Sequence, residues 1–246
     1  MRALNIIAIV ILTIMLSACE NTATLEARVT DAPITVDGTL INKVNVKISE
    51  VSVHMSQTVD ANAAGWVTLT TAPTTVDLLE FQSGTTALLG TQTLTAGHYQ
   101  QLRFTVESAI LTLGTTPVTT AVVTITSGVL RLNLDVTLEA NKKYGVTLDF
   151  DAAKSLDLSG GGWRMAPPVV KVREVYLINA DGTHTVLAKG SGATCTADSE
   201  CTANKGEKCC GAAGAMKCVD VKTDVNNCGS CGTSGCATCT DGVCNA

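Results

Sequence analysis

The chain has no cysteine between residues 20 and 194, few aromatic residues and no concentration of basic ones. Eleven cysteines are present, of which Cys19 stands alone and the other ten lie between Cys195 and Cys244. Aromatic residues make up 3% of the chain, so platforms for stacking on sugars or bases are scarce. Lys and Arg total 17 against 22 Asp and Glu, which argues against nucleic acid as a partner. The composition therefore separates a cysteine-free body from a cysteine-dense tail.

The first 18 residues have the pattern of an export signal. A positive start is followed by an apolar run that is shorter than the roughly 20 residues a membrane-spanning helix needs. The run ends in Leu16-Ser17-Ala18-Cys19, which resembles the bacterial lipobox. In that family the signal is removed and the cysteine sulfur carries a diacylglyceryl group. The resemblance implies a signal peptide over 1–18, lipid on Cys19, and a short tether over 19–24.

Lipid on Cys19 would make the bilayer the first expected partner of this protein. One acyl chain holds a protein only marginally, whereas two or three anchor it stably. Glu20 follows the cysteine. In enteric bacteria an Asp at that place resembles a signal for retention in the inner membrane. We therefore expect a lipid-anchored protein of the cell envelope, with the outer membrane favoured over the inner membrane.

The body, residues 25–190, is predicted to consist of a series of strands. Residues 131–140 and 143–151 alternate strictly between apolar and polar side chains, which is typical of half-buried strands. A short polar connection joins them and favours a hairpin. The same alternation runs through 42–55 and 99–113, with a slip of one residue in each that predicts a β-bulge.

Helix signals in the body are short. Residues 77–81 and 151–155 each begin with an Asp that can cap a single helical turn, and the sequence "DGT" at 181–183 fits a turn between two strands. Many short strands separated by turns predict an all-β fold, either a sandwich or a barrel. At this length the body can bury a core of its own.

Six motifs follow one another along the body: "RVTDAP" at 28–33, "VNVKISEVSVH" at 44–54, "GWVTL" at 65–69, "VDLLEFQSGTTALLG" at 76–90, "LTAGHYQQLRF" at 94–104 and "VTLDFDAAKSL" at 146–156. In this order they resemble domain-of-unknown-function family 4382, a module of bacterial and archaeal envelope lipoproteins. The resemblance covers about 25–175 and implies no established activity. The turn "LTAGHY" at 94–99 also resembles that of prealbumin-like sandwiches, so we expect a prealbumin/immunoglobulin-like β-sandwich.

The tail, residues 191–246, contains no Leu, Ile, Phe, Tyr or Trp and cannot fold by apolar burial alone. An even number of cysteines in an exported protein predicts a small segment stapled by disulfides, whose connectivity stays open. The stretch "CVDVKTDVNNCGSCG" at 218–232, with the cysteines after it, resembles cysteine-rich modules of myxobacterial and related surface proteins over roughly 209–244. Adjacent cysteines should bond to different partners. The predicted disulfide cysteines are Cys195, Cys201, Cys209, Cys210, Cys218, Cys228, Cys231, Cys236, Cys239 and Cys244.

Two C-x-x-C pairs, at 228–231 and 236–239, raise zinc and redox chemistry as alternatives. An oxidising compartment and the absence of a βαβ pattern weigh against both. The body contributes Asp149 and Asp151, and the tail contributes Asp220 and Asp224, as weak candidates for calcium ligands. Structural roles in turns and caps explain them more simply, so we expect no metal and no cofactor.

No motif supplies a nucleophile with its base, and the three histidines, His54, His98 and His184, are far apart in the sequence. Trp66 and Trp163 could stack on sugar, although core packing is the simpler role. We therefore expect a non-catalytic module for surface binding or adhesion, with an unidentified surface protein or glycan as ligand. The alternatives are a structural envelope component with a protease-resistant cap and, less favoured, an enzyme of undefined class.

Overall fold

The computed structural model describes residues 21–31, 40–56, 64–70, 72–81, 84–114, 116–165, 168–190, 192–203 and 206–245. The expected signal peptide and the expected lipidation site, Cys19, lie outside these residues. Among the residues described, no helix combines the length and the apolar character needed to cross a membrane.

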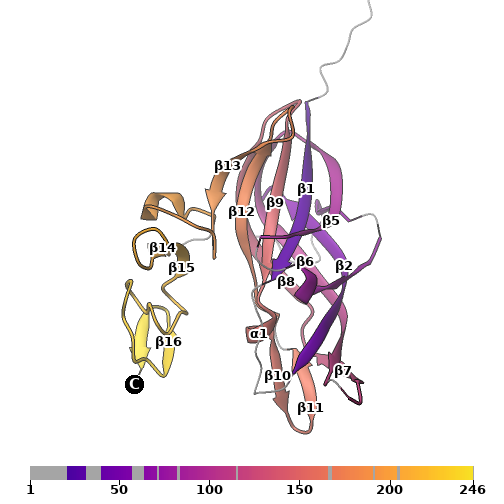
Figure 1. The fold of residues 1–246 in the computed structure, drawn as a ribbon. Coiled ribbons are helices and arrows are strands. Elements are labelled where there is room, and N and C mark those ends of the chain that lie inside the picture. Colours follow the sequence, from indigo (N-terminus) through magenta and orange to yellow (C-terminus); the bar gives the residue numbers. More distant parts are fainter. Residues whose placement is uncertain are drawn as a thin grey trace, which may run out of the picture.

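The body is all-β and folds as two packed sheets, as predicted (Figure 1). One sheet has five strands in the order β13-β12-β9-β1-β5, with β1 and β9 parallel at its centre. The other neighbours in this sheet pair antiparallel. Its strands are β1 (Thr22–Asp31), β5 (Ala87–Thr95), β9 (Lys143–Phe150), β12 (Val170–Ile178) and β13 (His184–Lys189).

The second sheet has eight strands. Six follow the order β10-β11-β7-β6-β2-β3, while β4 pairs with β2 and β8 pairs with β6. Two short helical turns, η1 (Leu78–Glu80) and α1 (Ala152–Ser155), interrupt the strands. The strands are β2 (Ile41–His54), β3 (Val67–Thr68), β4 (Thr74–Asp77), β6 (Gly97–Leu113), β7 (Thr119–Ile125), β8 (Val129–Leu138), β10 (Leu156–Ser159) and β11 (Gly162–Met165).

The core lies between the two sheets and is built from alternate residues of each strand. In β1, for example, Leu25, Ala27 and Val29 are fully buried. Phe104 of one sheet meets Phe150 of the other, with ring centroids 6.1 Å apart. Among the described residues, this core includes no cysteine. The described core of the sandwich is therefore built without disulfides.

Residues 131–140 and 143–151 provide β8 and β9 respectively, but the prediction that they pair as a hairpin is wrong. β8 pairs with β6 in the second sheet, whereas β9 pairs with β1 and β12 in the first. The connection between them therefore crosses from one sheet to the other. Alternation with period two looks the same in either sheet, so it identified the strands without identifying their partners.

The local predictions are confirmed. The pairing of β2 with β6 shifts between Lys47 and Glu50, which places the predicted bulges in both strands. The side chain of Asp77 accepts a hydrogen bond from Leu79 N and caps η1. Asp151 caps α1 in the same way, through Lys154 N. The turn at 181–183 joins β12 to β13.

The tail contains the short hairpins β14 (Glu207–Cys210) with β15 (Lys217–Asp220) and β16 (Thr238–Thr240) with β17 (Val243–Asn245), after the turn η2 (Asp198–Glu200). All ten predicted cysteines form disulfides, and the adjacent Cys209 and Cys210 bond to different partners. All four cysteines of the two C-x-x-C pairs are therefore in disulfides. The pairings are Cys195–Cys209, Cys201–Cys218, Cys210–Cys231, Cys228–Cys239 and Cys236–Cys244.

The tail packs along the side of the sandwich, beside β12 and β13 (Figure 1). Two ion pairs join the parts: Lys171 Nζ lies 2.9 Å from Asp220 Oδ2, and Lys189 contacts Glu200. The backbone N–H of Ala203 donates to Lys189 O at 2.9 Å, and the Ala203 side chain joins the buried core of the body. These contacts attach the tail to the body through polar groups and the buried side chain of Ala203.

Candidate functional site

A cleft of about 500 Å³ separates the sandwich from the tail, and both parts build its walls. The body contributes the end of β9, the turn α1 and the start of β12. The tail contributes β15 and the turn that follows it. The lining residues are Asp149, Asp151, Lys154, Val169, Lys171, Gly192, Lys217, Cys218, Val219, Asp220, Thr223 and Asp224.

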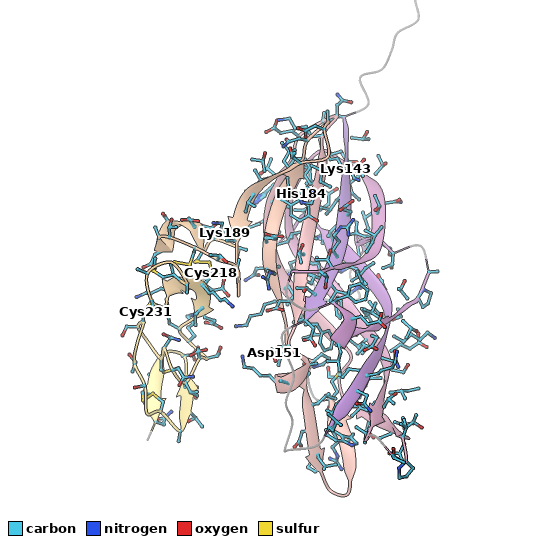
Figure 2. All side chains as sticks on the ribbon, in the orientation of Figure 1. Lys143, Asp151, His184, Lys189, Cys218 and Cys231 are labelled. Carbon is cyan, nitrogen blue, oxygen red and sulfur yellow. A yellow bond between two sulfur atoms is a disulfide. The ribbon has the colours of Figure 1, made fainter. Side chains whose placement is uncertain are left out.

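The body wall of the cleft places two carboxylates by different means. Asp149 lies on β9 with its side chain on the outer face of the sheet, because its neighbours Leu148 and Phe150 fill the core. Asp151 follows the strand and caps α1, as the Asp at the start of 151–155 predicts. Figure 2 shows Asp151 on the side of the sandwich that faces the tail. Lys154 Nζ lies 2.9 Å from Asp151 Oδ2.

The tail wall is organised by Asp220 at the end of β15. Its carboxylate accepts hydrogen bonds from Lys171 Nζ at 2.9 Å, from Thr223 Oγ1 at 2.9 Å and from the backbone N–H of Lys222 at 3.0 Å. Burial alone would raise the pKa of Asp220. The hydrogen bonds from Lys171 and the backbone outweigh it and hold that pKa below its ordinary value. Asp220 is therefore charged at neutral pH and fixes the tail to β12.

Asp149 is the carboxylate in the cleft whose bonding is incomplete. Its Oδ1 is buried and has no hydrogen-bond partner among the residues that the structure describes. Burial raises the pKa of Asp149, and the charge of Arg173 opposes that shift. A buried carboxylate oxygen without a partner is costly.

A second cavity of about 240 Å³ lies beside the chain segment that enters the tail. Thr30, Thr147 and Arg173 contribute to its sheet wall, and Ala193 contributes from the tail. Gly192 lines the first cavity, and the next residues, Ala193 and Thr194, line the second. A side chain at Gly192 would begin 3.5 Å from Asp149 Oδ2 and 3.6 Å from an Arg173 nitrogen, and the backbone has a φ of +80°. A Cβ would make only ordinary van der Waals contact at those distances, so the backbone conformation, rather than lack of space, favours glycine here.

The four weak calcium candidates, Asp149, Asp151, Asp220 and Asp224, lie together along this one cleft. The body pair and the tail pair are far apart in the sequence, so the sequence did not predict that they lie together. Lysines lie among them, and Asp151 and Asp220 are already ion-paired. Calcium needs six to eight oxygen ligands, so the paired carboxylates would first have to give up their ammonium partners. Charge compensation explains the cluster better than a metal does.

The other residues singled out in the sequence do not join this site. His54 contacts Ala64 O, His98 lies 2.7 Å from Asp135, and His184 stacks on Tyr176. Trp163 is 6% exposed and packs in the core. The guanidinium of Arg103 lies over the ring of Trp66, with Cζ 4.7 Å from the ring centroid.

Sequence reasoning missed the lysines of the cleft, Lys154, Lys171 and Lys217, together with Gly192. Lys154 follows the Asp151 cap at helical spacing, which is a local signal for their ion pair. Lys171 and Asp220 are 49 residues apart. Nothing in the sequence predicts that they meet.

Comparisons with known proteins place the body in a family. No curated protein matches the chain. A solved structure of a candidate cell adhesion protein from Bacteroides eggerthii matches with 18% identity and a TM-score of 0.29, over 61% of this chain and 54% of that one. The profile of the family described as "Domain of unknown function (DUF4382)" matches residues 22–167. The match covers more than half of the chain, so the protein belongs to the DUF4382 family.

Proposed function

We propose that this protein is a lipid-anchored, non-catalytic module of the cell envelope that binds a partner in the cleft between sandwich and tail. The observation that carries the proposal is the joint construction of the cleft. A tail that served only as a cap would have no need to leave a cavity of about 500 Å³ against the sheet. Ligand sites are concave, and they occur preferentially where two structural units meet.

Binding fits the chemistry of the cleft better than catalysis does. The carboxylates of Asp151 and Asp220 are each paired with a lysine, and the hydrogen bonds to Asp220 hold its pKa below the ordinary value, so that carboxylate is poorly suited to moving protons. Val169 and Val219 add apolar surface between the charges. Such a lining suits a ligand with both charged and apolar groups, such as a peptide segment of a surface protein or a charged glycan.

Anchoring rests on the lipobox-like Leu16-Ser17-Ala18-Cys19. Intact-mass analysis of the membrane fraction should find Cys19 at the N-terminus with added lipid, and Cys19→Ser should abolish it. The outer membrane is the favoured location, because Glu20 replaces the Asp of the inner-membrane signal.

The binding proposal is tested by filling the cleft. Val219→Trp adds a large ring on the cleft wall, and Val243→Trp adds the same ring in β17, where Val243 is 60% exposed. Each lipid-free variant is incubated with fractionated envelope protein and glycan. We expect Val219→Trp to lose at least about tenfold in affinity, or about 1.4 kcal/mol, while Val243→Trp binds as the parent does. Equal binding by both variants would show that the partner binds outside the cleft. No binding by the parent would favour the structural role.

A further inference from the structure

The first described residues of the chain are fixed to one end of the sandwich. The backbone N–H of Ala96 donates to Asn21 O at 2.8 Å, and that of Asn141 donates to Thr22 O at 2.7 Å. Thr24 N in turn donates to Lys142 O at 2.9 Å. The chain is therefore part of the fold from Asn21 onward, and no free linker follows that residue.

Three connections share this end of the sandwich. The turn from β5 to β6 (95–97) and the connection from β8 to β9 (139–142) hold the start of β1 directly. The turn from β12 to β13 (179–183) lies at the same level, because Ile178 pairs with Lys143, and Lys143 with Thr24. Figure 1 shows β1 beginning beside the β12–β13 turn. We name this surface the anchor end.

We propose that the anchor end rests directly on the lipid headgroup layer. The proposal builds on the proposed acylation of Cys19. Only Glu20 stands between Cys19 and Asn21, and two extended residue steps span at most about 7 Å. A protein held by so short a tether cannot move its anchor end away from the membrane surface.

The chemistry of the anchor end suits headgroups. Its connections carry small or polar side chains, with Glu139 and Lys142 exposed and ion-paired at 2.6 Å. In the 179–183 turn, Asp181 accepts from both the N–H and the hydroxyl of Thr183. Met55, which is 40% exposed and lies next to Gly97, adds one apolar side chain. This surface can bind phosphate, amine and hydroxyl groups and has little to insert into hydrocarbon.

The orientation that follows keeps the cleft free of the membrane. Lys143 lies at the anchor end of β9, and Asp149 lies six residues farther along the same strand, in the cleft. At about 3.3 Å per residue the cleft begins roughly 20 Å above the headgroups. A partner from outside the membrane can therefore reach it without displacing lipid.

The test places a fluorescent reporter at each end of the sandwich. Ala180→Trp lies in the anchor end, and Leu158→Trp lies in β10 at the opposite end, where Leu158 is 45% exposed. The acylated full chain is reconstituted into vesicles of phosphatidylethanolamine and phosphatidylglycerol that contain lipids with nitroxide-labelled headgroups. The parent protein corrects for Trp66 and Trp163. We expect quenching of Ala180→Trp to exceed that of Leu158→Trp at least about twofold, because nitroxide quenching requires proximity and the tether spans only about 7 Å.

A second variant inserts twelve Gly/Ser residues between Glu20 and Asn21. Such a linker spans about 19 Å on average, so quenching of Ala180→Trp should fall toward that of Leu158→Trp. Equal quenching at the two positions in the acylated parent background would overturn the orientation, and so would an unchanged value after the insertion. Absence of lipid in the intact mass would instead refute the anchoring. The two failures are therefore distinguishable.

Discussion

Reducing the five disulfides should unfold the tail, open the cleft and leave the sandwich folded. The bridges close segments with sequence separations of 8 to 21 residues. Chain-entropy arithmetic gives each about 2.5–3.3 kcal/mol. The apolar cluster of the tail consists of cystine sulfurs with Met216 beside them, so little else offsets the entropy of ordering the segment.

The sandwich should respond to reduction only slightly. Its core contains no cysteine among the described residues, and the tail contributes Ala203 alone to it. Burial of one methyl group stabilises by less than about 1 kcal/mol. We therefore expect a small decrease in the melting temperature of the sandwich, together with loss of the two ion pairs to the tail.

Limited proteolysis with and without reductant, followed by mass analysis, measures this outcome. With reductant, cleavage should concentrate after residue 190 and leave a resistant fragment that begins near β1. The near-ultraviolet circular dichroism of the body should persist, while ligand binding in the cleft should be lost. Cooperative loss of the whole fold on reduction would refute the reasoning, and so would a tail that stays protected without its disulfides.

Two further predictions follow from single contacts. Gly145→Ala would place a Cβ 2.3 Å from the ring of Tyr176, which is 1% exposed, so overpacking should cost about 2–3 kcal/mol in urea denaturation. The control Gly162→Ala meets nothing within 4 Å and should cost less than about 1 kcal/mol; equal costs would contradict the packing argument. The pKa of Asp220 is lowered from 3.8 in the folded state, so its contribution to tail docking is fully present well above that pH and is lost as the pH falls below it. Protease sensitivity of the tail should rise below about pH 4 in the parent, whereas Lys171→Met should weaken docking already at pH 7; a tail equally protected in both proteins at pH 7 would show that this ion pair does not hold it.

The sequence alone determined the strands, the local caps and the division into body and tail. Leu132, Leu134 and Val146 alternate with polar residues. This alternation is a local property, and it does not depend on which sheet the strand joins. The caps at Asp77 and Asp151 are equally local, because the bond they make lies within three residues. The even number of cysteines after residue 194 fixed the number of disulfides without fixing their connectivity.

Only the tertiary structure decided which elements meet. β8 and β9 are neighbours in sequence yet belong to different sheets, since pairing depends on the whole core rather than on the connection. At the cleft, Lys171 of the body pairs with Asp220 of the tail, 49 residues away. Such long-range contacts leave no periodic signal in either segment. The physical reason is that periodicity reports which face of a strand is buried, whereas partner choice is set by the sum of contacts over the folded chain.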